Sequence, residues 1–304
     1  MSFVYVTPTY RGDLERFRFL RESMVAVGVT QPHLAIVQTE DVARFRRAVP
    51  GDGLTIVPSR EVLAPRVERL RRLSRRAAVR HALPSRLRVH GWIAQQLVKL
   101  AAVDLVDAPV AVPLDSDAFF LRPIPDSMHD RAYLHEFVDA AAGPRTKRYY
   151  TAAESILGLP PGTGDPRRTY VSLVVPLSVE VTRDLRAHLD ERHGDWATAL
   201  VRHDATEYTT YGLFARHVQG LAKVEPVDRR LSAAFYEFTP ELFASVLREA
   251  AADPGVHLGM VHSHLPVPGS VFEPVVREVW RELPTLAPAT WSPPGGRAVR
   301  YGRV

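Results

Sequence analysis

Residues Gly91–Pro123, GWIAQQLVKLAAVDLVDAPVAVPLDSDAFFLRP, contain the segment that decides the fold class. The apolar run Val110–Leu114 has the length of a buried strand, and it ends directly at Asp115, Ser116 and Asp117. Open α/β sheets bind ligands at the carboxyl ends of their strands. Two carboxylates spaced i, i+2 repel each other unless a cation or a proton relieves them. We therefore expect a ligand site here, with Mg²⁺ or Mn²⁺ carrying a diphosphate as the simplest cation.

An Asp-x-Asp sequence is also common in turns and at helix N-termini, so its flanks matter. The preceding segment predicts a helix that carries Trp92, Gln95, Gln96 and Lys99. Gln95 and Lys99 are spaced i, i+4 and share a helix face. Two amides and an ammonium beside two carboxylates suit a bound polar ligand, and the alternative is a solvated helix face. We interpret Gln95, Gln96 and Lys99 as ligand contacts.

The opening strand, Phe3–Thr7, runs into the sequence TPTYRGD. The loop between the first strand and the first helix of an α/β sheet is a natural place for the base and ribose of a nucleotide. Its candidate contacts are Thr7, Thr9, Tyr10 and Arg11. Asp13 could join them or cap the following helix, and the two roles are compatible.

The stretch Ala205–Gly212, ATEYTTYG, surrounds Glu207 with hydroxyl side chains, and Asp204 precedes it. A carboxylate in the first turn of a helix can simply favour the helix dipole. In a transferase, a carboxylate that faces the substrate hydroxyl acts as the general base. Glu207 is therefore the candidate base, and Asp204 is its rival.

The sequence VHSH, Val261–His264, ends a late strand. His262 and His264 lie on one face if the strand continues through them. Imidazole nitrogen binds Mn²⁺ and other transition ions. One of these two histidines could bind a metal ion, or the histidines could have a structural role.

Strand and helix patterns alternate along the chain, which predicts an α/β fold with a doubly wound, mostly parallel central sheet and helices on both faces. The first half has expected strands at 3–7, 33–38, 54–58 and 110–114, and expected helices at 13–28 and 41–49. Later expected strands cover 131–137, 170–177 and 257–262. Later helices are expected near 152–157, up to 193, at 207–217 and at 271–283. The segment 139–166 is expected to form a mobile lid of loops around its short helix.

The composition is that of a globular protein, with 304 residues of which 46% are hydrophobic and 24% charged. No apolar stretch approaches the roughly 18 residues that span a bilayer, and the first residues lack the pattern of a signal peptide. The absence of cysteine excludes disulfides, thiolate catalysis and Cys-ligated zinc. The cytoplasm is the expected location.

The net charge is +5, and basic side chains concentrate in Arg66–Arg88. Such a run could bind nucleic acid or anionic lipid. It has no aromatic residue for base stacking. We therefore expect a solvated helix with one or two arginines reaching a phosphate, no nucleic-acid partner, and at most peripheral contact with a membrane surface.

In their order along the chain, TPTYRGD, GWIAQQLVKL, LDSD and TEYTTYG resemble the motifs of GT-A glycosyltransferases, and most of all a poorly characterised group of bacterial GT-A-like proteins. The resemblance extends from Phe3 to about Leu265, and the order is more specific than any one motif. It implies a GT-A fold and transfer of a sugar from a UDP- or GDP-linked donor to a hydroxyl or amine acceptor.

By this resemblance, Asp115 and Asp117 hold the divalent ion that bridges the donor diphosphate, with Asp117 the more direct ligand. The resemblance also implies a further metal ligand from His262 or His264 and a base at Glu207. The sequence TEY stands where many inverting enzymes have a Glu-Asp pair, so inversion and retention both stay open.

We expect a single domain over residues 1–283, with a nucleotide-binding part up to about 125, an acceptor part from 126, and a loosely held tail at 284–304. One rival function is a phosphohydrolase or phosphotransferase with Asp115 as nucleophile and Asp117 as acid. Its motif normally opens the chain, whereas here it lies past position 110. The other rival is a non-catalytic sugar-nucleotide-binding protein.

Overall fold

A computed structural model describes residues 3–49, 51–74, 89–124, 133–135, 137–138, 143–165, 167–227, 231–235 and 239–283. The predicted tail at 284–304, most of the basic run and parts of the predicted lid lie outside these residues. None of the helices in the described residues has both the length and the apolar character needed to cross a membrane.

The main sheet has five strands in the order β3-β2-β1-β4-β9. Strands β1 to β4 run parallel, and β9 joins the edge antiparallel to β4. Every residue of β1, β2 and β4 is buried, which is the condition of a parallel sheet covered on both faces. The bounds are β1 Phe3–Thr9, β2 His33–Val37, β3 Leu54–Pro58, β4 Val110–Pro113 and β9 Leu177–Ser178.

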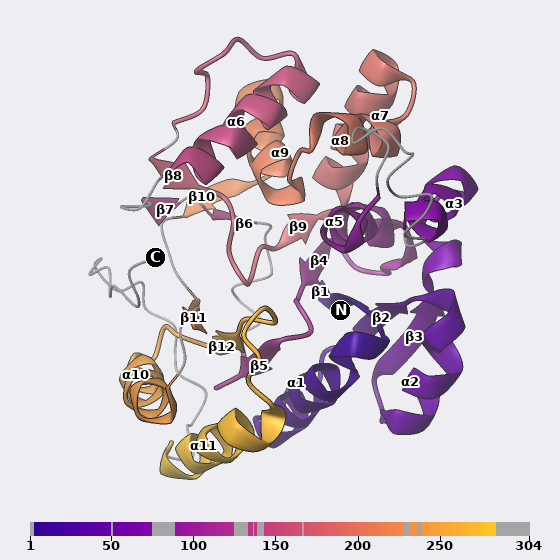
Figure 1. Cartoon of the computed structure of the whole chain (residues 1–304). Helices are drawn as coiled ribbons and strands as arrows, with labels where there is room; N and C mark the ends of the chain where they lie inside the picture. The colour runs from indigo at the N-terminus through magenta and orange to yellow at the C-terminus, as the bar shows by residue number, and fades with distance from the viewer. Residues whose placement is uncertain are drawn as a thin grey trace.

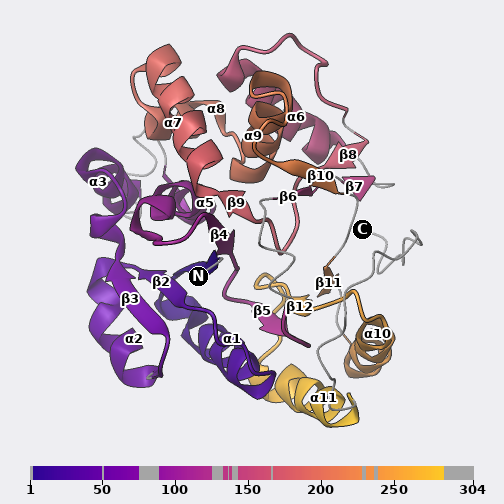
Figure 2. The same ribbon diagram turned by 180° about the vertical axis from the view of Figure 1, so that it is seen from behind.

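The strand order places helices on both faces of this sheet. The chain steps outward from β1 to β3 and then returns past β1 to β4, and right-handed crossovers therefore put the later helices on the opposite face. In Figure 1, and from behind in Figure 2, α1 and α2 lie below the strands and α5 lies above them. The order reverses between β1 and β4, which makes this pair the switch point of the sheet. The predicted doubly wound fold is confirmed, with α1 Leu14–Ala26, α2 Val42–Ala48, α3 Pro65–Ser74 and α5 Gly91–Ala101.

A second sheet begins where the chain leaves β4. It has the order β11-β12-β5, with β12 antiparallel to β5 and parallel to β11. Phe19 of α1, Phe119, Phe243 and Phe272 pack in one apolar cluster beneath it. The segment 115–117 is therefore held at both ends, because β4 of the main sheet precedes it and β5 of the second sheet follows it. The elements are β5 Ala118–Phe120, β11 Ser232–Phe235, β12 Leu258–Val261, α10 Pro240–Ala252 and α11 Gly269–Glu282.

A helical layer covers the other end of the main sheet, and in it α6 packs against α9. Its helices are α6 Pro144–Leu157, α7 Val179–His193, α8 Trp196–His203 and α9 Glu207–Leu213, followed by a π-helix at Phe214–Val218. Two small strand pairs flank it, namely β6 Tyr133–His135 with β10 Glu225–Val227, and β7 Phe137–Val138 with β8 Arg168–Thr169. Short 3₁₀ helices occupy Arg11–Asp13, Thr39–Asp41, Ser59–Glu61 and Ala102–Leu105.

Two predicted elements are wrong. The expected short helix at 152–157 is the last part of α6, which begins at Pro144 and ends against Gly158 in the left-handed conformation (φ 71°). The expected strand at 170–177 is strand only at its end, in β9. Tyr170 instead packs so closely on Gly212 that a Cβ there would come within 2.4 Å of its ring. Burial against a helix, rather than pairing in a ladder, explains the apolar residues of this segment.

The expected helix at 207–217 is α-helical only to Leu213 and then widens to a π-helix.

The basic helix α3 is also less solvated than expected. Arg71 is only 4% exposed and forms an ion pair with Glu68. Arg66 forms an ion pair with Asp195. Two arginines of the predicted basic surface therefore serve the fold.

A neutral histidine lies inside the main sheet. His33 is buried, with Nε2 2.8 Å from Thr7 Oγ1 and Nδ1 3.2 Å from Arg21 Nη1. Because a guanidinium only donates, Nδ1 accepts and Nε2 donates to the hydroxyl. Burial first, and the Arg21 charge second, lower the pKa of His33 to about 3.

We predict that this histidine makes the folded state less stable in mild acid. The imidazole of the unfolded chain titrates near 6.5, while the folded protein keeps His33 neutral down to about 3. The unfolded state therefore takes up the proton first as the pH falls, which costs the folded state about 2 kcal/mol between pH 7 and pH 5. Urea unfolding at both pH values should show that His33→Gln lacks this part of the pH dependence. Equal pH dependence in the variant and the wild type would contradict the account.

Candidate functional site

The predicted carboxylates lie at the switch point of the main sheet. Asp115, Ser116 and Asp117 follow β4, and Asp13 follows the neighbouring β1. Ser116 Oγ donates to Asp13 Oδ2 at 3.3 Å, so the two strand ends meet. Asp13 was predicted to be able to cap α1, but its side chain makes no capping hydrogen bond. Burial raises the pKa of Asp13, and the Ser116 hydrogen bond opposes this shift.

Lys99 connects this edge with the helical layer. Its Nζ lies 2.9 Å from Asp115 Oδ1 and 3.1 Å from Glu207 Oε1, and the side chain is 4% exposed. The same ammonium lies 4.9 Å from the centre of the Tyr208 ring. Burial alone would lower the pKa of Lys99, but Asp115, Tyr208 and Glu207 together raise it well above its ordinary value. Lys99 is therefore a fixed cation at the end of β4.

Glu207 is the buried partner of this lysine. It begins α9, whose N-cap Thr206 accepts from Thr209 N at 3.3 Å. Turned with its nitrogen toward the carboxylate, the Gln96 amide donates to Glu207 Oε1 at 3.2 Å. Burial raises the pKa of Glu207, and the Lys99 charge opposes this shift. The structure thus brings the predicted Gln96, Lys99 and Glu207 into one contact chain.

The rival carboxylate, Asp204, is placed differently. It ends α8 in the left-handed conformation (φ 52°), and its Oδ2 lies 3.8 Å from Arg148 Nη2 on α6. Gln95 is half-buried on α5, whereas Gln96 and Lys99 are both buried. The predicted polar face of α5 is therefore carried by Gln96 and Lys99.

Asp117 contacts the turn that follows β12. Ser263 N donates to Asp117 Oδ2 at 2.7 Å, which places the flanking His262 and His264 beside the carboxylates. Their ring centres are 4.2 Å apart. The strand ends at Val261, so the condition under which both rings would project from one continuing strand is not met. Burial first, and the Asp115 charge second, raise the pKa of Asp117 to about 6.

An arginine that the sequence pattern did not single out fixes this turn. Arg16 of α1 donates from Nη1 to Val261 O at 2.5 Å and from Nη2 to Leu265 O at 3.2 Å. Its charge also opposes the raised pKa values of Asp13 and Asp117, after the larger effects of burial on each. Only the fold brings α1 to this turn, so no local signal could have identified Arg16.

The donor types suit a divalent metal, but the side chains do not converge on one point. Asp115, Asp117 and the two histidines offer the oxygen and nitrogen ligands that Mn²⁺ accepts. Within the described residues, no three histidine or acidic side chains lie close enough together to hold an ion. Asp115 is engaged by Lys99 in this arrangement.

The predicted nucleotide contacts at the end of β1 and directly after it divide into two kinds. Thr7 is fully buried and uses its hydroxyl on His33, so it lies in the core. Thr9 is 6% exposed, and among the described residues its Oγ1 has no hydrogen-bond partner. Tyr10 is 39% exposed, with its ring so close to Gly12 that a Cβ there would come within 2.5 Å. Tyr10 is thus placed at the edge, where a ligand could reach its ring, whereas the Thr9 hydroxyl is buried.

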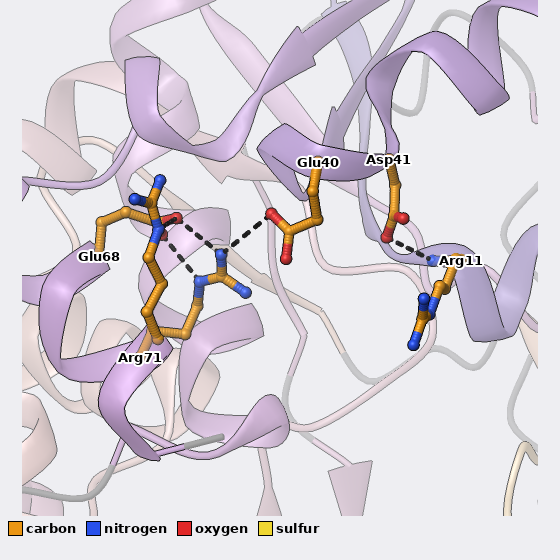
Figure 3. A network of polar contacts seen from close by, with 6 residues as sticks. Arg11, Glu40, Asp41, Glu68 and Arg71 are labelled. Carbon is orange, nitrogen blue, oxygen red and sulfur yellow. Dashed lines mark hydrogen bonds and ion pairs between the residues drawn. The ribbon is translucent and has the colours of Figure 1, made fainter. Parts of the chain in front are cut away.

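A further polar network runs along the same edge, past the ends of β1 and β2 (Figure 3). Arg11 N donates to Asp41 Oδ2 at 3.1 Å. Arg71 donates to Glu68 through Nε at 2.8 Å and Nη2 at 2.6 Å, and its Nη2 lies 3.9 Å from Glu40 Oε2. The i, i+3 spacing of Glu68 and Arg71 was the available signal for this pair, whereas its contact with Glu40 depends on the fold.

No curated protein matches the chain. Among solved structures, it is similar to the galactosyltransferase LgtC in complex with donor and acceptor sugar analogues, with 12% identity, a TM-score of 0.43, and coverage of 94% of this chain and 98% of that chain. The structure of an active-site mutant of LgtC is 13% identical, with a TM-score of 0.44 and the same coverage of both chains. Neither likeness carries a conclusion about activity.

One family model, described as a family of unknown function, matches residues 4–234. The matched part holds β1 to β4, the Asp-x-Asp segment, Lys99 and Glu207, and it stops before the histidine turn. Because the match covers most of the 304 residues, the chain belongs to the Family of unknown function (DUF6492).

Proposed function

We propose that this protein is a metal-dependent glycosyltransferase that moves a sugar from a UDP- or GDP-linked donor to a hydroxyl or amine acceptor. The observation that carries the proposal is the charge at the switch point of the sheet. Asp13, Asp115, Asp117 and Glu207 gather there around two cations, Lys99 and Arg16. Such an excess of carboxylates favours a divalent cation, and a nucleoside diphosphate brings one with it.

The residues of this edge have separate tasks in the proposal. Thr9 and Tyr10 would contact the nucleoside, because one is a buried hydroxyl without a described partner and the other an exposed ring. Asp115, Asp117 and one of His262 and His264 would hold the ion. When bound, that ion would supply charge stabilisation for the departing diphosphate. Lys99 would add a fixed positive charge beside it.

In the transfer, the acceptor oxygen or nitrogen forms a bond to the anomeric carbon of the sugar. The bond from that carbon to the diphosphate oxygen breaks, and the acceptor proton passes to a base. Glu207 stays the candidate for this base, with Asp204 as the rival. Turnover of Glu207→Gln and Asp204→Asn decides between them, because loss of a true base should cost about 10²- to 10⁴-fold. If both variants keep their turnover, neither carboxylate is the base, and a retaining mechanism without a protein base becomes the better account.

The contacts of Glu207 support a second role, which is to hold Lys99 against Asp115. A carboxylate that is 2% exposed and bound by an ammonium and an amide is well suited to fixing its partners. The expected cytoplasmic location stays a proposal, and so does peripheral membrane contact through the basic segment Arg66–Arg88 as the most that this segment would add.

We predict that Asp117→Asn removes the metal-dependent part of nucleotide binding. The amide keeps the shape and can still accept from Ser263 N, but it is a weaker ligand for a hard cation. Titration calorimetry with UDP and GDP should show Mn²⁺ tightening binding to the wild type and not to the variant. Asp165→Asn, an exchange of the same kind next to Arg167, is the control. Unchanged Mn²⁺-dependent affinity in Asp117→Asn would remove the metal site from the proposal.

We predict that Lys99 acts on the ligand as well as on the fold. Lys99→Met leaves Glu207 buried without its ammonium, which should cost about 3–5 kcal/mol of stability. Lys99→Met combined with Glu207→Gln removes the stranded charge and should recover most of that loss. Thermal melting and UDP titration separate the two roles, since the double variant should be stable and still bind UDP weakly. Full recovery of both stability and affinity would make Lys99 purely structural.

A further inference from the structure

A basic cavity lies beside α3, at the outer edge of the main sheet. Its volume is about 380 Å³, and cavities that hold small molecules begin at about 300 Å³. In Figures 1 and 2, α3 lies on the same side of the molecule as β3, the edge strand of this sheet. The described lining contains no residue of the proposed donor or metal site. It consists of Arg60, Pro65, Glu68, Arg69, Arg72 and Leu73.

Two elements with a defined backbone build this lining. The five lining residues of α3 are spaced i, i+3, i+4, i+7 and i+8 from Pro65, so they share one face of the helix. Arg60 belongs to the 3₁₀ helix Ser59–Glu61, and Leu63 N donates to Ser59 O at 2.9 Å to close this turn. Because α3 packs against the same turn, the arginines of both elements reach one cavity.

The carboxylate in the lining is already compensated. Arg71 donates to both oxygens of Glu68, from Nε at 2.8 Å and from Nη2 at 2.6 Å (Figure 3). Arg71 also lies 3.9 Å from Glu40, so this buried arginine has two acidic neighbours. Arg72 adds a third contact to Glu68, from its Nε to Oε1 at 3.2 Å. Glu68 therefore contributes little free negative charge to the cavity.

The three arginines of the lining carry the excess charge, and solvent reaches each of them. Arg60 and Arg69 are exposed, and the Arg72 side chain is 56% exposed. Within the part of the chain that the structure describes, neither Arg60 nor Arg69 forms a hydrogen bond or an ion pair. Like charges spaced i, i+3 on a helix repel each other, as Arg69 and Arg72 do here. An anion in the cavity would relieve this repulsion.

We propose that this cavity binds a phosphomonoester through Arg60, Arg69 and Arg72. A phosphomonoester carries a charge of about −1.5 to −2 at neutral pH, and three arginines against Glu68 leave an excess of two positive charges. A guanidinium binds phosphate through parallel hydrogen bonds. The inference goes beyond the proposed sugar transfer and does not depend on it.

The rest of the lining indicates what the phosphate is attached to. Pro65 and Leu73 offer an aliphatic surface to the organic part of the ligand. The described lining has no aromatic side chain on which a base could stack, which favours a small aliphatic or sugar phosphate over a nucleotide. The same phosphomonoester group occurs in soluble metabolites and in the headgroup of phosphatidic acid, so the experiment has to separate the two sources.

Titration calorimetry of the full chain with glycerol 3-phosphate, and with glycerol as the neutral match, tests binding. We expect only the phosphate to bind, and Arg69→Gln and Arg60→Gln each to weaken it about ten- to a hundredfold. Sedimentation with phosphatidylcholine vesicles that contain phosphatidic acid identifies the source, and vesicles of equal charge made with phosphatidylglycerol control for surface charge. Preference for phosphatidic acid that Arg69→Gln abolishes assigns a lipid headgroup, and calorimetric binding without this preference assigns a soluble ligand.

Arg44→Gln is the matched control, because it removes an exposed arginine of α2 that does not line the cavity. Arg69→Gln should melt no lower than the wild type, since Arg69 has no described partner to lose. Should it still unfold, Arg60→Gln tests the same cavity from another element.

The inference is overturned if the wild type binds neither glycerol 3-phosphate nor phosphatidic acid vesicles. It is overturned as well if Arg44→Gln weakens binding as much as the two cavity variants do. A loss of UDP affinity with Mn²⁺ in Arg69→Gln would place the cavity in the donor site and would also contradict it. Because the phosphate titration requires neither a donor nor turnover, its failure is distinguishable from failure of the proposed transferase activity.

Discussion

The site depends on one buried ammonium, that of Lys99, which joins the end of the central sheet to the helical layer. The lysine lies between Asp115 after β4 and Glu207 at the start of α9. Breaking a buried ion pair by removing one partner is costly because it leaves a charge without compensation. The contact therefore fixes α5, α9 and the end of β4 relative to one another. The same two ion pairs therefore determine both the charge at the candidate site and the packing of these helices.

The neighbourhood of this lysine explains how charged side chains are held together at the junction of two sheets. The chain passes from β4 to β5 through Asp115, Ser116 and Asp117, and Arg16 holds the turn after β12 against them. Two apolar clusters, one under each sheet, position the carboxylates from both sides. The excess negative charge is thus held in place by packing, which leaves it available to a cationic ligand.

The sequence predicted the first half of the fold well because its signals are local. Apolar strands such as 54–58 have strong boundaries, and helical spacing predicted the helix that carries Gln95, Gln96 and Lys99. It failed at 170–177, where apolar residues pack on a helix instead of pairing as a strand. It also missed the true start of α6 at Pro144.

The remaining parts of the site are contacts between distant residues. Lys99 and Glu207 are joined only in the folded chain, and Arg16 reaches a turn that lies near the other end of the sequence. Periodic patterns in the sequence indicate local structure and do not indicate such long-range pairs. The predicted grouping of Asp115, Asp117, His262 and His264 as metal ligands stays a prediction, although the Ser263 contact brings their segments together.

The central claim is that this edge binds a divalent ion together with a nucleoside diphosphate. Electron paramagnetic resonance of Mn²⁺ tests it most directly, because the signal of the free ion disappears on binding. With UDP or GDP present, adding the protein should remove free Mn²⁺ up to one ion per chain, beyond what the nucleotide alone removes. A free-ion signal that the protein leaves unchanged with both nucleotides would contradict the account.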